Sequence, residues 1–462
     1  MEHVVESYRW HVAAVVGLAL VLPPSLIPAA AEPGGGRHEI PDTGPARAQA
    51  SERDTVDLRI LGVNDLHGNL EPLREGDRAV GGVAYLDAHL DGQERAYPGR
   101  AIRVHAGDMV GASPLVSGRY RDEPTVRAMN EMGFDVGTLG NHEFDEGGEE
   151  MLRLLNGGGG EGGGPADGRF LGADFPYVSA NVQYRGSGET VLPPYAVVER
   201  DGVRVGFIGA TTEDTPLGLM PEAAEPFRFT GIAGAVNRQA TALEAEGVEA
   251  IIVLAHAGGT PGGAGEAPRG EIFEETARMS DEVDAVISGH THNIIDARVG
   301  GKVVVQAGEY GEAFSVVDLR IDRRSGEVVR AEGEVLPTLS DAVRPDRALN
   351  ALVERYGESV APVSDRTVAN AAGGVSRRAT PAGESAMGDL VADGQRAYAG
   401  ADLAFVNTPG LREDLPSGPT TYGELFAVHP FGDDLVRIEM TGDAVLRVLE
   451  QQHAGGRRRI LG

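Results

Sequence analysis

The sequence predicts an α/β protein, and two observations support this fold class. Short apolar runs alternate with segments of helical periodicity after residue 56, as in α/β layers rather than in all-helical or all-β folds. Several predicted strands are followed directly by polar residues of the kind that bind metals. With 462 residues, of which 41% are hydrophobic, the chain can form two or three domains and is not intrinsically disordered.

The predicted elements follow one another in a regular order. The apolar runs that we interpret as strands lie at 56–63, 101–105, 136–139, 203–208, 250–255, 283–287 and 303–307. The predicted helices lie at 82–91, 125–132, 149–155 and 232–246. A strand-turn-strand unit closes this block, which we expect over 56–338. A linking helix is expected within 339–362, and a second domain over 363–462.

The composition excludes several classes of function. The formal net charge of −29 makes a nucleic acid polymer a poor partner, because phosphate backbones are bound by basic surfaces. The absence of cysteine excludes a disulfide framework, a thiol nucleophile and a zinc-thiolate site. Any metal must therefore be held by His, Asp, Glu or Asn. The single lysine and the 66 glycines are typical of a GC-rich bacterial genome.

The N-terminus has the features of a secretory signal peptide over 1–31. An apolar stretch at 12–27, interrupted by prolines, is followed by Ala29-Ala30-Ala31, which matches a cleavage site. We expect cleavage after Ala31, a flexible linker over 32–55, and an extracytoplasmic protein that is secreted or held in the cell envelope. Arg9 is the only firm positive charge before the apolar stretch, so an uncleaved anchor is the alternative. No later segment is long and apolar enough to span a membrane.

Metal-ligand side chains follow five of the predicted strands. The carboxyl ends of strands in open α/β folds meet in one crevice, so residues far apart in sequence can converge there. Ligands two positions apart also point to the same side of an extended backbone. A single such residue is most often structural, but together they predict a site of oxygen and imidazole ligands, which suits Mn, Zn, Co, Fe or Mg. The candidate ligands are Asp65, His67, Asp108, Asn141, His256, His290 and His292.

At these residues the sequence resembles the calcineurin-like metallophosphoesterases, and within them the bacterial 5′-nucleotidase and UDP-sugar hydrolase group. The matching motifs are Asp65-x-His67-Gly68, Gly107-Asp108, Gly140-Asn141-His142-Glu143, His256 and Gly289-His290-Thr291-His292. The resemblance implies a four-layer α/β/β/α domain followed by a partial α+β 5′-nucleotidase C-terminal domain. It also implies two metal sites, whose ligands are Asp65, His67 and His292 for one, Asn141, His256 and His290 for the other, and Asp108 for both.

The same resemblance implies a catalytic pair beside the metals. His142 would stabilise the transition state and protonate the leaving oxygen, and Asp145 follows closely enough to orient its imidazole. The alternative is that His142 only caps the next helix. Two cations about 3.5–4 Å apart can hold a hydroxide and neutralise phosphoryl oxygens during in-line displacement. Glu143 is left without a role, and His105 and His429 are interpreted as packing residues.

The second domain resembles the 5′-nucleotidase C-terminal domain. Asn407 and Arg412 of the loop Asn-Thr-Pro-Gly-Leu-Arg would contact a nucleotide, and Phe431 would stack on its base. Arg377 or Arg378 would add a phosphate contact, because a guanidinium pairs with phosphate in two places. The alternatives are that Phe431 is ordinary core and that Arg377 is a solvated surface charge. The loop departs from the usual Asn-Gly-Gly-x-Arg-like form.

The resemblance implies a family that normally continues well beyond residue 462, which leaves three explanations: a fragment, a frameshifted gene or a naturally short variant. We favour the interpretation that the second domain is truncated. We therefore expect exposed apolar surface and weak base selectivity there. The implied function is an exported two-metal phosphohydrolase of nucleoside 5′-monophosphates, with UDP-sugars as further candidate substrates, no stable membrane span after signal cleavage and an undetermined oligomeric state. The alternatives are a 2′,3′-cyclic-nucleotide phosphodiesterase with 3′-nucleotidase activity, a thiosulfate-ester hydrolase, and a non-catalytic secreted protein that binds nucleotides or metals. The complete ligand set and the His142–Asp145 pair argue against the binding protein.

Overall fold

The computed structural model describes residues 7–8, 54–75, 78–158, 164–165, 169–262, 266–380, 383–432 and 434–451. Apart from residues 7 and 8, the predicted signal peptide over 1–31 lies outside the described residues, as does most of the predicted linker over 32–55. Within the part of the chain that the structure describes, we find no helix with the length and apolar character needed to cross a membrane.

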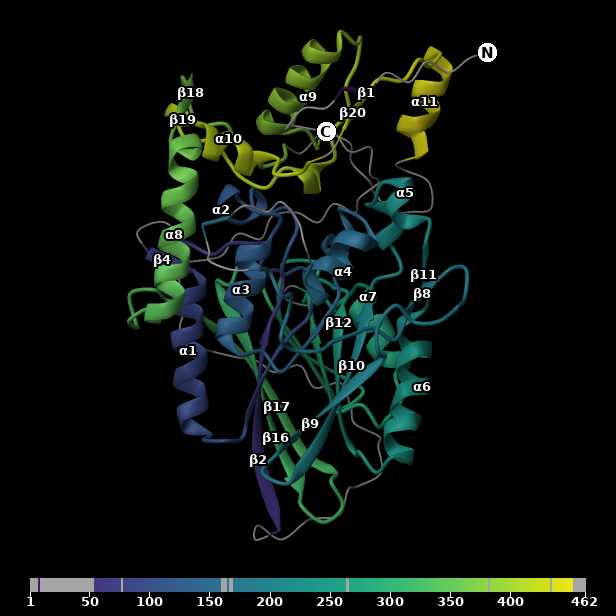
Figure 1. Ribbon diagram of the computed structural model, residues 1–462. Helices are drawn as coiled ribbons and strands as arrows, with labels where there is room; N and C mark the ends of the chain where they lie inside the picture. The colour runs from purple at the N-terminus through teal and green to yellow at the C-terminus, as the bar shows by residue number, and fades with distance from the viewer. Residues whose placement is uncertain are drawn as a thin grey trace.

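Two six-stranded sheets form the centre of the structure (Figure 1). In the first sheet, with strand order β17-β16-β2-β5-β6-β7, the strands β2, β5, β6 and β7 run parallel. In the second sheet, with order β14-β15-β13-β12-β10-β9, the four middle strands run parallel and both edge strands are antiparallel. The first sheet consists of β2 (Thr55–Val63), β5 (Ala101–His105), β6 (Val136–Thr138), β7 (Tyr177–Val178), β16 (Ala313–Asp322) and β17 (Val328–Pro337). The second consists of β9 (Tyr195–Arg200), β10 (Val203–Thr211), β12 (Ala250–His256), β13 (Ala285–Ser288), β14 (Ile294–Val299) and β15 (Lys302–Ala307).

The two sheets share one apolar core between their facing surfaces. Leu58 and Ile60 on β2 point into it, as do Phe207 on β10 and Ile252 on β12, and all four side chains are fully buried. Residues two positions apart on a strand face the same side, so each strand sends alternate residues into this core. The other face of each sheet is then available for helices.

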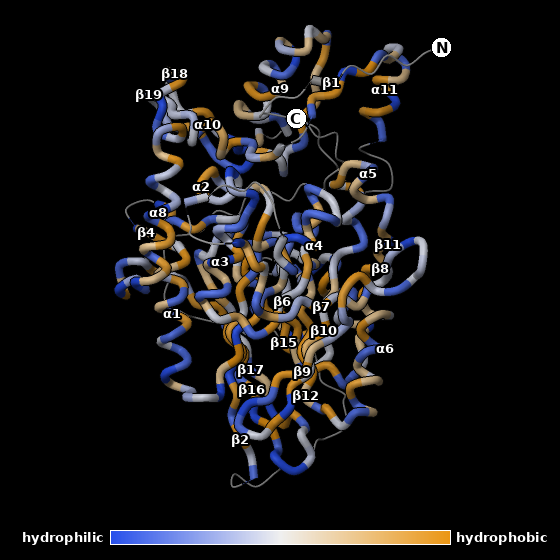
Figure 2. Tube along the Cα trace, in the orientation of Figure 1, coloured by the Kyte–Doolittle hydropathy of each residue, from blue (hydrophilic) through white to orange (hydrophobic). Residues whose placement is uncertain are grey.

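Helices cover the outer faces of both sheets. The helices α1 (Val83–Ala96) and α3 (Glu123–Met132) lie on the side of the first sheet, and α8 (Arg347–Ser364) packs against these two helices. The helices α6 (Ile232–Ala245) and α7 (Glu271–Arg278) pack on the second sheet. The apolar strands form the interior in Figure 2, and the outward sides of the flanking helices are hydrophilic. The layer order is α/β/β/α, which confirms the predicted fold class.

Shorter elements complete this domain. They are β3 (Pro72–Glu75), β4 (Arg78–Gly81), α2 (Leu115–Gly118), the 3₁₀ helix His142–Phe144, α4 (Gly148–Asn156), β8 (Val182–Tyr184), the 3₁₀ helix Thr215–Leu217, α5 (Pro221–Ala224) and β11 (Phe227–Phe229). The sequence analysis missed the antiparallel edge strands β9 and β14. Both are only partly buried. In β14 the apolar run is interrupted by Asp296, whereas β9 carries a short apolar run, Tyr195–Val198, that the sequence analysis did not use.

Helix α8 leads from this domain into the C-terminal part of the chain. It corresponds to the helix predicted within 339–362 and begins at Arg347, because Asp346 caps it by accepting hydrogen bonds from the backbone N–H groups of Ala348 and Leu349. In Figure 1 it runs along the side of the structure up to the C-terminal elements, which lie above the strand ends. These elements are β18 (Thr367–Ala371), α9 (Ala386–Ala399), the 3₁₀ helix Thr408–Gly410, β19 (Gly418–Thr421), α10 (Tyr422–Val428), β20 (Leu435–Val436), which pairs with β1 (Ser7–Tyr8), and α11 (Gly442–Gln451).

The C-terminal part has a small core in its described residues. Its buried cluster consists of Met387, Val406, Leu411, Leu415 and Val428. Nine of the thirteen large apolar side chains that the structure records as exposed lie between residues 368 and 446. This part therefore presents far more apolar surface for its size than the four-layer domain does.

Candidate metal centre

The candidate ligands lie at the carboxyl ends of strands from both sheets. Asp65 and His67 follow β2, Asp108 follows β5, and Asn141 follows β6, all in the first sheet. From the second sheet, His256 is the last residue of β12, and the loop after β13 carries the two remaining histidines. Because parallel strands end at the same edge, the fold brings all seven predicted ligands into one region.

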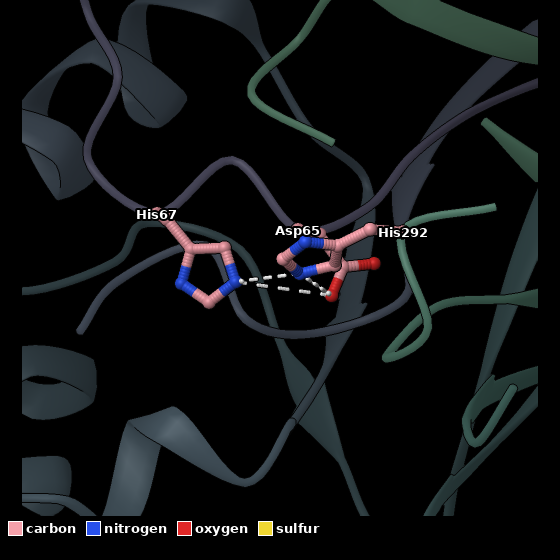
Figure 3. Close-up of side chains that lie close together, drawn as sticks. All are labelled: Asp65, His67 and His292. Atoms are coloured by element: carbon pink, nitrogen blue, oxygen red, sulfur yellow. Dashed lines mark hydrogen bonds and ion pairs between the residues drawn. The ribbon is translucent and has the colours of Figure 1, made fainter. Parts of the chain in front are cut away.

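One group of ligand atoms is formed by Asp65, His67 and His292 (Figure 3). Nε2 of His67 lies 3.2 Å from Nε2 of His292 and 3.9 Å from Oδ1 of Asp65. Nε2 of His292 lies 3.4 Å from the same Asp65 oxygen. Three donor atoms thus face one another closely enough to share a single cation.

A second group is formed by Asn141, His256 and His290. Oδ1 of Asn141 lies 2.8 Å from Nδ1 of His290 and 3.1 Å from Nε2 of His256. His256 and His290 also form a cluster with the carboxylate of Asp108, in which the ligand atoms lie within 4.8 Å of one another.

The carboxylate of Asp108 connects the two groups. Its Oδ2 lies 3.0 Å from Nε2 of His256 in the second group and 3.8 Å from Nε2 of His67 in the first. Its Oδ1 accepts a hydrogen bond of 2.8 Å from the backbone N–H of His142, which fixes the orientation of the carboxylate. The Asp108 carboxylate therefore lies between the two groups, and its role as a ligand of both metals stays a prediction.

Hydrogen bonds on the far side of three imidazoles determine which nitrogen faces the centre. Nδ1 of His67 donates to the carbonyl of Gly111 at 2.9 Å, and Nδ1 of His256 donates to the carbonyl of Ala106 at 2.8 Å. Nδ1 of His292 pairs with the carboxylate of Glu309. In all three residues Nε2 is left to act as a ligand, which is the usual arrangement for metal-binding histidines.

The electrostatics of this region favour a cation. Burial lowers the pKa of His256, but the Asp108 carboxylate outweighs burial and raises it to about 9. Burial likewise lowers the pKa of His292, but the Glu309 and Asp65 carboxylates raise it to about 10. Burial keeps His67 and His290 neutral, with the pKa of His290 lowered to about 4. The raised pKa values of His256 and His292 show that the neighbouring carboxylates stabilise positive charge in this region. Divalent cations fit this set of carboxylate, amide and imidazole ligands.

Five of the seven candidate ligands have strained backbones. Ten non-glycine residues in the described part of the chain have positive φ angles, and five of these are candidate ligands. The left-handed conformation disfavours side chains with a Cβ atom, and such strain is concentrated at functional sites. The five ligands are Asp65, His67, Asp108, His290 and His292, with φ angles from 47° to 80°.

His142 lies beside the ligand groups and contacts the C-terminal part of the chain. Nη2 of Arg412 lies 2.9 Å from its Nε2, and Oδ2 of Asp145 lies 2.7 Å from its Nδ1. A guanidinium can only donate, so Nε2 is the acceptor and Nδ1 donates its proton to Asp145. Burial lowers the pKa of His142, but the carboxylates of Asp145 and Asp108 outweigh burial and raise it.

The other predicted substrate residues differ in their distance from this centre. The Phe431 ring lies 6.0 Å from the His142 ring and 5.6 Å from the Arg412 guanidinium, so both residues face the candidate centre. Asn407 precedes the 3₁₀ helix Thr408–Gly410, and its Oδ1 is buried without a hydrogen-bond partner in the described structure. Arg377 is exposed, and its backbone N–H donates to Asp414. The structure thus brings Arg412 and Phe431, but not Arg377, into contact with the residues around His142.

Sequence reasoning missed two acidic residues that support the centre. Glu309 follows β15 and pairs with His292, and Glu143 accepts hydrogen bonds from the backbone of two ligand-bearing loops. The signal for Glu309 was available, because it follows a strand as the other site residues do. Glu143 was visible inside its motif, but only the structure shows which groups its carboxylate contacts.

Comparison with known protein families identifies the larger domain. A family model described as calcineurin-like phosphoesterase matches residues 58–293, which is slightly more than half of the chain. The chain belongs to the calcineurin-like phosphoesterase family. A second model, described as the 5′-nucleotidase C-terminal domain, matches residues 364–460 of this calcineurin-like phosphoesterase. The predicted family and enzyme class, metal-dependent phosphoester hydrolases, are confirmed, and the family implies divalent metal ions as cofactors.

Several proteins of known sequence or structure resemble this calcineurin-like phosphoesterase over most of its length. Endonuclease YhcR of Bacillus subtilis is 37% identical over 90% of this chain and 34% of its own length. Cell wall protein Lmo0130 of Listeria monocytogenes is 35% identical over 88% of this chain and 57% of its own length. The chain thus spans between a third and three fifths of these two relatives. The crystal structure of a 5′-nucleotidase precursor from Thermus thermophilus has 27% identity and a TM-score of 0.68, covering 81% of this chain and 74% of that one.

Proposed function

We propose that this protein is an exported phosphohydrolase that holds two divalent cations and releases phosphate from nucleoside 5′-monophosphates. The observation that carries the proposal is the pair of ligand groups joined by Asp108, which lies 3.0 Å from His256 and 3.8 Å from His67. The match to a 5′-nucleotidase C-terminal domain supports a nucleotide as substrate. The relative described as a cell wall protein supports an extracytoplasmic location.

The proposed roles of the ligands follow from the two groups. One cation would be held by Asp65, His67 and His292, the other by Asn141, His256 and His290, and both by Asp108. When bound, such a pair of divalent cations neutralises the phosphoryl oxygens and activates the attacking water. This neutralisation matters because the formal net charge of the chain is −29, which would otherwise repel an anionic substrate.

His142 is the proposed acid for the leaving oxygen of the ester. Its Nδ1 proton is held by Asp145 at 2.7 Å, so Nε2 is the atom that faces the substrate side. Arg412 donates to that nitrogen at 2.9 Å. A substrate phosphoryl group would accept the Arg412 hydrogen bonds instead, because a guanidinium pairs strongly with phosphate. Nε2 of His142 is then available to carry the proton that the leaving oxygen needs.

The C-terminal part would bind the nucleoside. Phe431 offers an aromatic ring for stacking on the base, and Asn407 offers a buried carbonyl oxygen without a partner in the described structure. Burial raises the pKa of Glu309, but the charges of His292, Arg377 and Arg412 lower it, so the exposed Arg377 lies near enough to the centre to be a further candidate phosphate contact. UDP-sugars are further candidate substrates, because they present the same nucleoside and phosphate groups.

The test is phosphate release from AMP, UMP and UDP-glucose with Mn, Co, Zn or Mg added. We expect release from AMP by the native protein, none by Asp108→Ala or Asn141→Ala, and unchanged release by Glu266→Ala, whose side chain is 65% exposed. Binding of metal without cleavage of any ester would instead identify a non-catalytic binding protein, and would contradict the proposal.

Hydrolysis of phosphodiesters is the second candidate function. The relative with 37% identity is described as an endonuclease, and a diester hydrolase would use the same two ligand groups. Bis(p-nitrophenyl) phosphate, 2′,3′-cyclic AMP and a single-stranded oligonucleotide therefore belong in the same assay. A kcat/KM for any diester above that for AMP would favour this candidate, whereas cleavage of AMP alone would exclude it.

A further inference from the structure

Glu143 is a buried carboxylate whose partners in the described structure are backbone amides. The residue is only 4% exposed. Oε2 accepts hydrogen bonds from the backbone N–H groups of Asp108 at 3.0 Å and of Gly140 at 2.5 Å, and Oε1 accepts from Met109 at 3.0 Å. Burial and the Asp108 charge raise the pKa of Glu143 to about 7, while the amide hydrogen bonds act in the opposite direction. Both oxygens act only as acceptors, so this geometry belongs to the ionised carboxylate.

The three amides belong to two different loops. Asp108 and Met109 lie in the loop after β5, whereas Gly140 lies in the loop after β6, directly before Asn141. One carboxylate thus joins the backbone of the proposed bridging ligand to that of a proposed ligand of the second cation. No other side chain that the structure describes accepts from both loops in this way.

The two loops approach each other as closely as backbones can. A Cβ atom on Gly107 would lie 2.5 Å from the backbone nitrogen of Gly140, and one on Gly140 would lie 2.1 Å from Oδ1 of Asp108. Asp108 itself has a φ of 52° in the disfavoured left-handed region. A strained backbone persists only when surrounding interactions stabilise it. The three hydrogen bonds that Glu143 accepts hold the two loops in this close arrangement.

We propose that Glu143 is a positioning residue of the metal centre, which fixes Asp108 and Asn141 at the separation that two cations require. This inference rests on the metal sites of the proposed function but not on the identity of the substrate. Glutamine in this place keeps one acceptor oxygen but turns an NH2 group toward at least one of the three buried N–H groups, which then lacks an acceptor, so the two loops move apart. The site that depends on both loops, formed by Asn141, His256, His290 and Asp108, is then weakened most.

The test compares Glu143→Gln with a matched control, Glu150→Gln. Glu150 is also a buried glutamate, 8% exposed, but it pairs with Arg121 and Arg153 away from the ligands. In Glu143→Gln we expect Mn²⁺ affinity of at least one site to fall about 10- to 100-fold. We also expect the exchange-coupled EPR signal of a Mn²⁺ pair to give way to that of isolated Mn²⁺. Glu150→Gln should retain both properties even if its melting temperature falls.

Full Mn²⁺ affinity at two sites together with a coupled signal in Glu143→Gln would overturn the inference. If that variant does not fold, the inference is tested by hydrogen exchange of the backbone amides in the native protein. We expect the amides of 108, 109 and 140 to be protected without added metal, because Glu143 rather than a cation holds them. Exchange at the rate of exposed loops would contradict this. Failure of nucleotide hydrolysis with both metals bound would count only against the proposed substrate, so the two failures are distinguishable.

Discussion

Arg412 donates a 2.9 Å hydrogen bond to His142 although 270 positions separate the two residues in the sequence. The contact joins the C-terminal part of the chain to the proposed acid of the other domain. It also uses Nε2 of His142, the nitrogen to which the proposed function assigns the proton for the leaving oxygen. The contact therefore places a guanidinium, which the proposed function assigns to phosphate binding, directly beside the proposed acid.

Replacement of Arg412 by alanine should lower kcat/KM for AMP by about 10- to 100-fold, since a charge-assisted hydrogen bond contributes about 1.5–3 kcal/mol. Steady-state kinetics of the variant checks this expectation. Arg396→Ala is the matched control, because that guanidinium pairs only with Asp393 on the surface of α9 in the contacts described. Equal kcat/KM values for native protein and Arg412→Ala would exclude a substrate contact.

Removal of metal should lower both activity and stability. Ligands come from both six-stranded sheets, so a bound cation ties the sheets together and stabilises only the folded state. At a metal concentration 100 times Kd, the free energy of unfolding should rise by about 2.7 kcal/mol per site. Thermal melting with EDTA and with added Mn²⁺ measures the difference. The rise should shrink in Asp108→Ala; an unchanged rise would show that the cation binds elsewhere.

The stability of the protein should fall in mild acid because of His105. Burial lowers the pKa of this histidine to about 3, well below its value of about 6.5 in an unfolded chain. Between these values the unfolded state binds more protons, so stabilisation is complete above pH 6.5 and is lost as the pH falls. The loss between pH 8 and pH 5 should be about 2 kcal/mol from this group.

Denaturant unfolding of His105→Asn at both pH values tests the assignment. Asparagine keeps an acceptor for the backbone N–H of Gly107, which lies 3.3 Å from Nδ1 of His105, but it cannot titrate. The pH dependence of the variant should therefore be smaller by that amount. An identical pH dependence in both proteins would mean that another group causes it.

Gly137 should not tolerate a side chain. A Cβ atom there would lie 1.8 Å from Nε2 of His105, whose ring is enclosed by Phe134, Phe175 and Tyr177. We expect Gly137→Ala to lower the free energy of unfolding by about 1–3 kcal/mol or more. Urea unfolding measures the change.

Gly92→Ala provides the opposite case for the same experiment. Gly92 lies inside α1 with nothing within 4 Å of its Cβ position. Alanine there should stabilise the protein by about 0.5–1 kcal/mol, because it favours the helix. A destabilised Gly92→Ala or an unaffected Gly137→Ala would contradict the packing described here.

The sequence predicted the strands that are apolar along their whole length, and therefore the edge where the site forms. β12, which is buried at every position, was predicted almost to its last residue. β14 was not predicted, because its burial is irregular and its place is set by pairing with β15. The linking helix was predicted within 339–362, but its exact start at Arg347 is set by the cap at Asp346, which carries no apolar signal.

The site was predictable to the extent that its residues follow strands in recognisable motifs. The seven candidate ligands could be named from the sequence, although their roles stay a prediction. The contacts of Glu143 and Glu309 could not be named, because they depend on where a carboxylate points after folding. The approach of Arg412 to His142 depends on how the C-terminal part packs against the strand ends, which no local pattern encodes.

The left-handed backbones of five candidate ligands imply that the residues that suit the proposed metal centre are not those that suit stability best. The five are Asp65, His67, Asp108, His290 and His292. Glycine adopts this conformation without the penalty of roughly 1 kcal/mol that other residues incur. A descendant released from selection for activity could therefore become more stable as glycine replaced its ligands. Retention of all five non-glycine residues among descendants would instead indicate that selection for the metal centre has continued.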